Sequence, residues 1–372
     1  MKVLHICNDF CFSKVHANLF SRLDALGVEQ TIFTFYSESV RRGRNNEFDA
    51  ARTSFFYKDI LKPWHRILFH NKIKTVLRAL QESVKIEDHD IVHASSLFTN
   101  GVLAYKLFKK YHIPYIVAVR TTDVDEFFRY APHTWRVGLK TLLNASKIVF
   151  ISKSIENSFV SSPVVKTILF KINNKFVLQP NGIDDYWIEK AGILPVRDNH
   201  QLITVCRFDA NKNVERLIKA VVSLRSKFPD IKLHLVGGGD SQEKRILELV
   251  ANHPETLAFH GRKEKDDLRE LYAQCSIFAM PSHHETFGLV YIEALSQDLA
   301  IICTRGQGVD GLLDSRVGEF VNSHSQQSIE DAIARIFEHR EDYLSYEVMN
   351  FNAYNWNTIA EKYIELYKQV LS

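Results

Sequence analysis

A chain of 372 residues is longer than a single hydrophobic core usually is, so we expect two domains of about 150 to 200 residues each. Its composition, 45% hydrophobic and 24% charged, is that of a globular protein. No apolar run approaches the roughly 18 residues of a membrane span, which excludes a helical integral membrane protein. The first residues lack the long apolar region of a signal peptide, so we expect a cytoplasmic location.

Charge is distributed unevenly along the chain. Residues 1 to 190 hold 27 Lys and Arg against 18 Asp and Glu, a net of +9, whereas residues 191 to 372 hold 20 against 26, a net of −6. This asymmetry indicates that the first half meets an anionic partner, such as a phospholipid surface or a phosphate-bearing substrate. No nucleic-acid-binding motif accompanies the charge, so nucleic acid is not predicted as a partner. The five cysteines are few, odd in number and scattered, which favours buried reduced thiols.

The first half alternates short apolar runs with stretches long enough for helices. Such alternation predicts a parallel sheet covered on both faces. A first helix is expected to end at Gly27. The expected strands are 2–7, 29–36, 90–95, 114–120 and 147–152.

The second half repeats this plan, with an amphipathic helix expected over 213–224 and a polar linker over 186–200. Two doubly wound, Rossmann-like domains facing across a cleft are therefore predicted, with ligands at the carboxyl ends of the strands. A dinucleotide-binding protein would carry G-x-G-x-x-G after its first strand, but residues 7–18 contain no glycine, which argues against hydride transfer. The expected strands of the second half are 202–207, 231–237, 257–261, 276–282 and 299–304.

Two glutamates flank a predicted helix start in PSHHETFGLVYIEAL, residues 281 to 295. If the helix begins near Gly288, the amides of Gly288 and Leu289 attract a phosphate, and the glycine allows close approach. Glu285 and Glu293 are then suited to accept hydrogen bonds from sugar hydroxyls. A nucleotide sugar would use both the helix amides, through its diphosphate, and the two glutamates, through its hydroxyl groups. The alternative is a capping acid and a solvated helix residue.

Two further stretches favour a diphosphate ligand. Arg207 follows a predicted strand, and Lys212 comes five residues later, so both cations are expected at the carboxyl edge, where the alternative is a pair of exposed basic side chains. LVGGGD, residues 235 to 240, places Gly238 and Gly239 in a loop that would allow close backbone contact with a nucleotide, although such loops are common.

These motifs together resemble those of family 4 glycosyltransferases, retaining enzymes of the GT-B fold. Arg207 and Lys212 match R-x4-K, the glycine loop matches the family's own, and Glu285 with Glu293 matches E-x7-E. The resemblance covers nearly the whole chain. It implies that residues 1–188 form an acceptor-binding domain and 189–355 a donor-binding domain, and that 356–372 return to the first domain.

The resemblance also implies roles for these residues. Glu293 would bind the ribose hydroxyls, while Glu285 and the amides following Phe287 would bind the donor sugar. Arg207 and Lys212 would bind the diphosphate. Backbone groups around Arg262 are expected to contact the base. The donor is expected to be UDP- or GDP-linked, and neither a cofactor nor a metal is predicted.

The first half departs from the family pattern at two points. Where the family has a Gly-Gly pair, this chain has DFCFSKVHANLF, so Ser13 and Lys14 are expected to contact the donor or acceptor through side chains. Where the family has a histidine, this chain has Arg120 in VRTTD, ahead of Asp123, and both residues are expected on the acceptor or donor-sugar side. The triplet DVD at 123–125 imitates a metal-binding D-x-D, but so short a match arises easily by chance.

A basic and aromatic stretch, residues 55–80, is predicted to form an amphipathic helix. It carries Lys58, Lys62, Arg66, Lys72, Lys74 and Arg78 against one acid, Asp59. Such a helix is suited to an anionic membrane surface, and equally to packing on its own domain with a solvated basic face.

The sequence therefore predicts a retaining, metal-independent glycosyltransferase that moves a sugar from a nucleotide-diphosphate sugar to a glycan or lipid-linked acceptor. Cell-surface polysaccharide or glycolipid synthesis is the expected setting, on the cytoplasmic face of the membrane. The alternatives are an epimerase or inverting transferase of the same fold, and a sugar-nucleotide-binding protein with little turnover.

Overall fold

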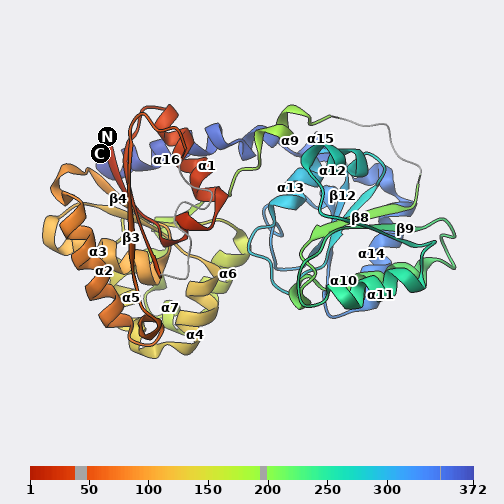
Figure 1. Ribbon diagram of the computed structural model, residues 1–372, viewed down its shortest axis with the longest axis horizontal. Helices are drawn as coiled ribbons and strands as arrows, with labels where there is room; N and C mark the ends of the chain where they lie inside the picture. Colours follow the sequence, from red (N-terminus) through yellow and green to blue (C-terminus); the bar gives the residue numbers. More distant parts are fainter. Residues whose placement is uncertain (38–47, 193–198, 344) are drawn as a thin grey trace. The chain divides into compact units, whose positions relative to one another are not determined.

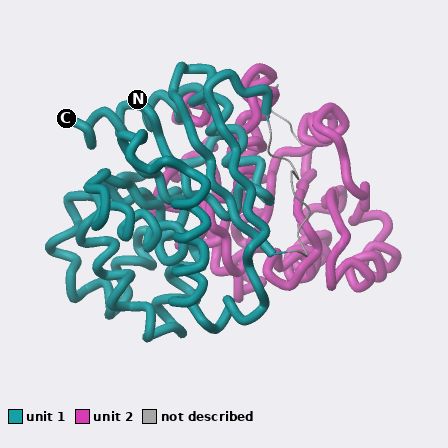
Figure 2. Tube along the Cα trace, turned by 60° about the vertical axis from the view of Figure 1, so that its left-hand side comes forward, with its two compact units in different colours: residues 1–151, 155–182, 356–372 teal, residues 152–154, 183–355 magenta. Residues whose placement is uncertain are grey.

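The computed structural model describes residues 1–37, 48–192, 199–343 and 345–372, which form two compact units. Figure 2 colours unit 1 (residues 1–151, 155–182 and 356–372) and unit 2 (152–154 and 183–355) separately. The family resemblance implies a division after residue 188. Unit 2 begins earlier, at Ile183, because α9 (Asp185–Glu189) buries Trp187 beside Tyr272, with ring centroids 5.5 Å apart. Part of the predicted linker, 193–198, lies outside the described residues.

Unit 1 is built on a parallel sheet of seven strands in the order β3-β2-β1-β4-β5-β6-β7 (Figure 1). Central strands are buried along their whole length because helices cover both faces. The strands are β1 (Lys2–Ile6), β2 (Glu29–Ser37), β3 (Thr53–Leu61), β4 (Ile91–Ala94), β5 (Tyr115–Ala118), β6 (Lys147–Phe150) and β7 (Phe176–Leu178).

The last helix of the chain, α16 (Trp356–Leu371), packs on unit 1 beside α1 (Lys14–Ala25), as Figure 1 also shows. Trp356, Ile359 and Tyr363 join a core that includes residues of β1 and α1. The C-terminal segment is therefore part of the first unit. The other helices are α2 (Phe69–Ser83), α3 (Val102–Tyr111), α4 (Phe128–Tyr130), α5 (Pro132–Asn144), α6 (Lys153–Ser161), α7 (Pro163–Lys166) and α8 (Leu169–Ile172).

Unit 2 repeats the architecture with six parallel strands in the order β10-β9-β8-β11-β12-β13. They are β8 (Gln201–Cys206), β9 (Lys232–Gly237), β10 (Leu257–Gly261), β11 (Ile277–Met280), β12 (Ala300–Thr304) and β13 (Gly318–Val321). The helices besides α9 are α10 (Val214–Leu224), α11 (Glu243–Asn252), α12 (Lys265–Tyr272), α13 (Leu289–Ser296), α14 (Gln326–Glu338) and α15 (Ser345–Val348).

Both faces of the second sheet are covered. On one face, α10 and α14 pack in a single core with strand residues such as Leu233 and Ile302. On the other face, Phe278 meets Tyr272 of α12 and Tyr291 of α13 edge to face. The predicted fold class, two doubly wound α/β domains with parallel sheets, is thereby confirmed.

One predicted helix is wrong over its first half. Residues 53–61 form β3, which pairs with β2, and the helix begins only at Phe69. The aromatic run at Phe55 to Tyr57 is suited to a pleated surface, and Pro63 disfavours the helical conformation at Lys62. The shorter helix α2 buries one apolar face on its own unit. The edge strands β7 and β13 were also missed.

All five cysteines are free thiols, and four of them are buried. Within the described part of the chain, no helix combines the length and apolar character needed to cross a membrane.

Candidate active site

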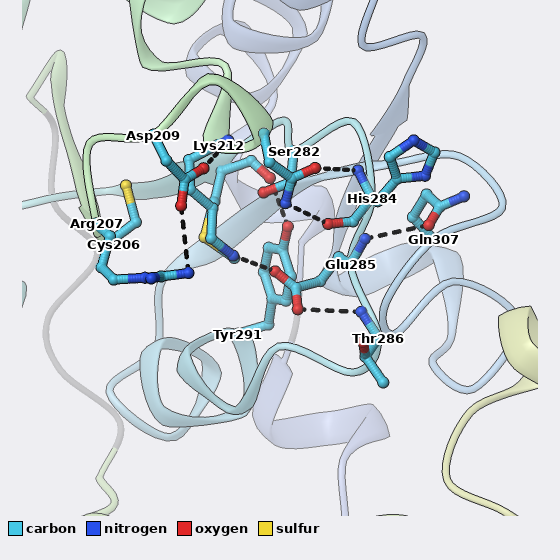
Figure 3. A network of polar contacts seen from close by, with 12 residues as sticks. Cys206, Arg207, Asp209, Lys212, Ser282, His284, Glu285, Thr286, Tyr291 and Gln307 are labelled. Atoms are coloured by element: carbon cyan, nitrogen blue, oxygen red, sulfur yellow. Dashed lines mark hydrogen bonds and ion pairs between the residues drawn. The ribbon is translucent and has the colours of Figure 1, made fainter. Parts of the chain in front are cut away.

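Lys212 and Glu285 form an ion pair at the carboxyl end of the unit 2 sheet (Figure 3). Lys212 ends a 3-10 turn, Ala210–Lys212, that follows β8, and Glu285 lies in the loop between β11 and α13. Lys212 Nζ lies 2.7 Å from Glu285 Oε2, and the two side chains are only 17% and 13% exposed. Removing either partner would leave an uncompensated charge in a poorly solvated position, so the pair fixes both side chains.

Arg207 lies beside this pair but is much more exposed. It follows β8, and its guanidinium is 3.3 Å from Asp209 and 3.5 Å from Asp240, while its side chain is 70% exposed. Ion pairs of this kind are weak in water, so an incoming anion could displace them. Asp209 also accepts a hydrogen bond from the Lys212 amide, which connects the two predicted cations through one carboxylate (Figure 3).

Two asparagines join the Lys212 turn to the Glu285 loop. Asn211 Nδ2 donates to the carbonyl of His284, and Asn211 Oδ1 accepts from the His284 amide, both at 2.8 Å. Asn213, at φ +56°, donates through Nδ2 to the carbonyls of Pro281 and Ser323. The loop that carries Glu285 is therefore fixed by hydrogen bonds to residues 73 and 68 positions earlier in the chain.

Helix α13 begins at Leu289, as predicted, with Gly288 at φ +78° before it. A Cβ on Gly288 would lie 2.6 Å from the Tyr291 ring, so both conformation and space require glycine. The first amides of the helix have no intrahelical acceptor and attract an anion. Phe287 is 2% exposed, so its side chain anchors the loop and only its backbone remains for a ligand.

Glu293 lies in the second turn of α13 and is half-buried. Burial, with a smaller contribution from the charge of Asp184, raises the pKa of Glu293 to about 7, and Lys265 partly offsets this. Strong perturbation of a carboxyl pKa at the edge of a sheet is typical of functional sites. Glu293 is thus close to half-ionised at neutral pH.

The glycine loop after β9 lies next to Arg207. Gly237, Gly238 and Gly239 all have positive φ, and a Cβ on Gly237 would come within 1.9 Å of the Cys206 carbonyl oxygen at the end of β8. The Arg262 guanidinium lies over Gly239, 2.8 Å from where a Cβ would be. The structure therefore brings Arg207, the glycine loop and Arg262 to neighbouring positions at the carboxyl ends of β8, β9 and β10.

The four predicted residues of unit 1 lie at the carboxyl ends of β1 and β5. Ser13 precedes α1 and Lys14, which is exposed, begins it. Arg120 Nε donates to the Ser95 carbonyl at 2.8 Å, across the ends of β5 and β4. This contact holds the guanidinium against the sheet edge.

Asp123 is buried, and its carboxylate already has backbone partners. It is 1% exposed, and its carboxylate accepts hydrogen bonds from the amides of Leu97, Phe98 and Arg120 at 2.9 to 3.1 Å. Burial raises the pKa of Asp123 to about 6, although these amides favour the ionised form. Its contacts are those of a residue that fixes the loops after β4 and β5.

Sequence reasoning missed the residues that hold the site together. Asn211 and Asn213 are the asparagines described above, and Gln307 accepts a hydrogen bond from the Glu285 amide at 3.1 Å. The run DANKN, residues 209 to 213, contains the available signal, because Asp and Asn favour turns that bond to nearby backbone.

Models of two glycosyltransferase domains match successive parts of the chain. Residues 13–185 match the model described as Glycosyltransferase Family 4, and residues 185–356 match Glycosyl transferases group 1. The chain belongs to glycosyltransferase family 4.

Curated relatives of this family 4 glycosyltransferase are distant. An uncharacterized glycosyltransferase of Methanocaldococcus jannaschii is 23% identical over 268 residues, 69% of this chain and 68% of that protein. The alpha-monoglucosyldiacylglycerol synthase of Acholeplasma laidlawii is 23% identical over 333 residues, 83% of this chain and 80% of that protein.

Solved structures share the fold over the whole chain. Sucrose-phosphate synthase from Thermosynechococcus elongatus has a TM-score of 0.74 and 20% identity, covering 99% of this chain and 98% of the other. The structure described as trehalose-6-phosphate from E. coli bound with UDP-2-fluoro glucose has a TM-score of 0.71 and 12% identity, covering 100% of this chain and 99% of the other. The fold is therefore that of GT-B glycosyltransferases.

Proposed function

We propose that this glycosyltransferase transfers a sugar, with retention and without a metal, from a nucleotide-diphosphate sugar bound by unit 2 to an acceptor bound by unit 1. The observation that carries the proposal is the Lys212–Glu285 pair beside Arg207 and the start of α13. Cations and helix amides near the carboxyl end of the sheet would suit a leaving diphosphate, and a carboxylate beside Lys212 would suit sugar hydroxyls. The solved structure with UDP-2-fluoro glucose supports a nucleotide-sugar donor.

The chemistry follows from what each side chain can do. In a front-face substitution, the bond from the anomeric carbon to the diphosphate oxygen breaks, and the acceptor oxygen bonds to the same face while its proton passes to the departing diphosphate. Arg207 and Lys212 stabilise the negative charge that develops on that leaving group. Glu285, paired with Lys212, orients the donor sugar, and Glu293 binds the ribose hydroxyls. Because two side-chain cations supply positive charge, this scheme needs no divalent metal.

The acceptor we propose is a glycan or a lipid-linked sugar on the cytoplasmic face of a membrane. The net charge of +9 in residues 1–190 supports an anionic partner for unit 1. The name of the Acholeplasma relative, a glucosyldiacylglycerol synthase, supports glycolipid synthesis over a soluble acceptor. Polysaccharide synthesis remains the alternative setting.

Donor binding and transfer are tested in sequence. Thermal shift against UDP, GDP and ADP sugars identifies the donor, and a melting temperature unchanged by every one of them would refute the proposal. Proton NMR of the product then reports the anomeric configuration: retention is expected, and inversion would refute the front-face scheme. A donor that binds but is neither transferred nor hydrolysed would favour the alternative, a sugar-nucleotide-binding protein with little turnover. The presence of Arg120 where the family has a histidine is the sequence feature that supports this alternative.

A further inference from the structure

A pocket of about 570 Å³ opens at the outer carboxyl edge of the unit 1 sheet. Ser37 and Leu61, the last residues of β2 and β3, line it together with Lys62, Arg66 and Lys72. Among its described lining residues there are three cationic side chains and no carboxylate. A concave site with charge of one sign concentrates the opposite charge, so an anion is the expected occupant.

A buried histidine fixes the turn that presents two of these cations. His65 is 6% exposed, its Nδ1 accepts a hydrogen bond from the Lys62 amide at 3.0 Å, and its Nε2 contacts Asn71 Oδ1 at 3.1 Å. With Nδ1 as the acceptor, Nε2 carries the proton and donates to Asn71. The turn Pro63–Arg66 is therefore tied to the first turns of α2, and the basic side chains extend from an ordered backbone.

Lys72 connects the pocket to the predicted acceptor edge of the sheet. Its Nζ donates to Thr99 Oγ1 at 3.3 Å, in the π-helical turn Leu97–Gly101 that follows β4. Burial lowers the pKa of Lys72, and the charge of Asp9 after β1 partly offsets this. A partly desolvated cation gains more from a bound anion than a solvated one does, because water competes less for it.

Apolar side chains are exposed on the same segment as the cations. Trp64, Ile67 and Leu68 are 54%, 80% and 52% exposed, directly beside Lys62 and Arg66 in sequence. Binding of a soluble anion would require only the cationic side chains and would not explain the exposed apolar ones. Basic residues next to exposed aromatic and aliphatic side chains are instead the combination that binds the interface of an anionic membrane.

We propose that this pocket binds the phosphate of a membrane lipid, either the lipid-linked acceptor itself or its anionic neighbour, with Lys62, Arg66 and Lys72 around the phosphate and Trp64, Ile67 and Leu68 in the interface. This inference rests on the proposed transfer to a lipid-linked acceptor. From the sequence, a membrane contact would extend along a long helix over 55–80. The proposed contact is instead confined to the phosphate pocket and the exposed apolar side chains of residues 64–68.

The test compares the whole protein with two charge-matched variants. Lys62→Gln/Arg66→Gln removes two cations from the pocket, and Lys106→Gln/Lys109→Gln removes two exposed cations from α3. Each protein is titrated with vesicles of phosphatidylcholine alone, vesicles of phosphatidylcholine mixed with phosphatidylglycerol, and soluble glycerol 1-phosphate. Co-sedimentation and the emission of Trp64, with Trp64→Phe as the blank, report binding.

We expect wild type to bind the anionic vesicles and not the neutral ones. The pocket variant should bind about 30-fold more weakly, since each lost cation near the surface weakens binding several-fold, and the α3 variant should change by less than about threefold. Equal losses in the two variants, or no binding to anionic vesicles, would overturn the inference. Binding of glycerol 1-phosphate without binding to either vesicle would overturn the assignment to a lipid.

Nucleotide-sugar binding, measured by thermal shift on the same proteins, separates the two proposals. It should be unchanged in both variants because the donor residues lie in unit 2. If a donor binds and the vesicle result fails, only the lipid site is wrong. If vesicles bind through the pocket and no donor binds, the proposed function fails and the pocket remains.

Discussion

Replacing Glu293 by glutamine should stabilise the protein at alkaline pH. The raised pKa of Glu293, about 7 against an ordinary value of 4.5, means that the folded protein holds a proton which the unfolded chain releases. Each unit of pKa difference corresponds to about 1.4 kcal/mol, so the burial of this carboxylate costs about 3 kcal/mol once pH exceeds the folded pKa. Because the folded pKa is the higher one, wild-type stability falls as pH rises from about 4.5 to about 7.

The measurement is thermal unfolding of wild type and Glu293→Gln at about pH 5 and pH 8.5. By linkage, the variant's advantage should grow by about 2.5 kcal/mol between these values, or roughly 5 to 10 °C for a unit of this size. Glu270→Gln, on the exposed face of the neighbouring helix α12, is the control and should show no such pH-dependent gain. A gain at Glu293 that is the same at both pH values would refute the reasoning.

Glu293→Gln should also weaken binding of the donor. If the ionised Glu293 accepts hydrogen bonds from the ribose, loss of a charged acceptor costs about 2 kcal/mol, or about 30-fold in affinity. Wild-type affinity should fall about tenfold from pH 8 to pH 6 as the carboxylate takes up a proton, and the variant should lose this pH dependence. Calorimetry with the donor sugar measures both. An unchanged affinity in the variant would remove the ribose role.

Three further predictions concern the other parts of the site. Arg207→Ala and Lys212→Ala should each reduce turnover about 100-fold or more, and near-normal rates in both single variants would contradict the scheme. Only Lys212→Ala should also lower the free energy of unfolding, by about 3 kcal/mol, because it leaves the Glu285 carboxylate without its lysine. Adding Glu285→Gln to the Lys212→Ala variant should restore that stability. Gly237→Ala should prevent stable folding of unit 2 because its Cβ would overlap the Cys206 carbonyl, whereas Gly306→Ala, with positive φ but open space, should cost only about 1 kcal/mol in urea unfolding. Chelation by EDTA should leave transfer unchanged, and loss of activity that Mg²⁺ or Mn²⁺ restores would refute metal independence.

Most strands of the two sheets could be predicted because they are largely apolar, and the central ones are buried along most of their length. Buried parallel strands read as continuous apolar runs, and all ten strands expected from such runs are present in the structure. The three missed strands lie at sheet edges. β13 begins with Gly318 and contains Glu319, neither of which favours a strand, and its pairing with β12 places the missing Gly318 Cβ only 2.0 Å from the Ile301 carbonyl. Tertiary packing determines such a strand, so local pattern could not reveal it.

The sequence predicted the position of the two cations at a strand end, but not the side-chain contacts that they make. Spacing placed Arg207 and Lys212 at a strand end, where the structure has them. Spacing could not indicate that Lys212 pairs with Glu285, 73 residues later, because that contact depends on the order of β8 and β11 in the sheet. The long helix over 55–80 was wrong for a similar reason, since pairing with β2 decides the conformation of residues 53–61.

The two units use carboxylates in different ways, and this determines what substitutions there should do. In unit 2, Glu285 pairs with a lysine side chain at the predicted diphosphate position, so a change alters the charge that a ligand meets. In unit 1, the Asp123 carboxylate accepts hydrogen bonds from three backbone amides, one of them that of Arg120. A substitution of Asp123 would therefore release the loops after β4 and β5. Arg120, which stands in the place of the family histidine, is held by the same carboxylate through its amide and by Ser95 through its side chain. Replacing Arg120 by histidine would therefore remove the hydrogen bond from its guanidinium to the Ser95 carbonyl, while the amide contact with Asp123 and the pairing of β4 with β5 would remain.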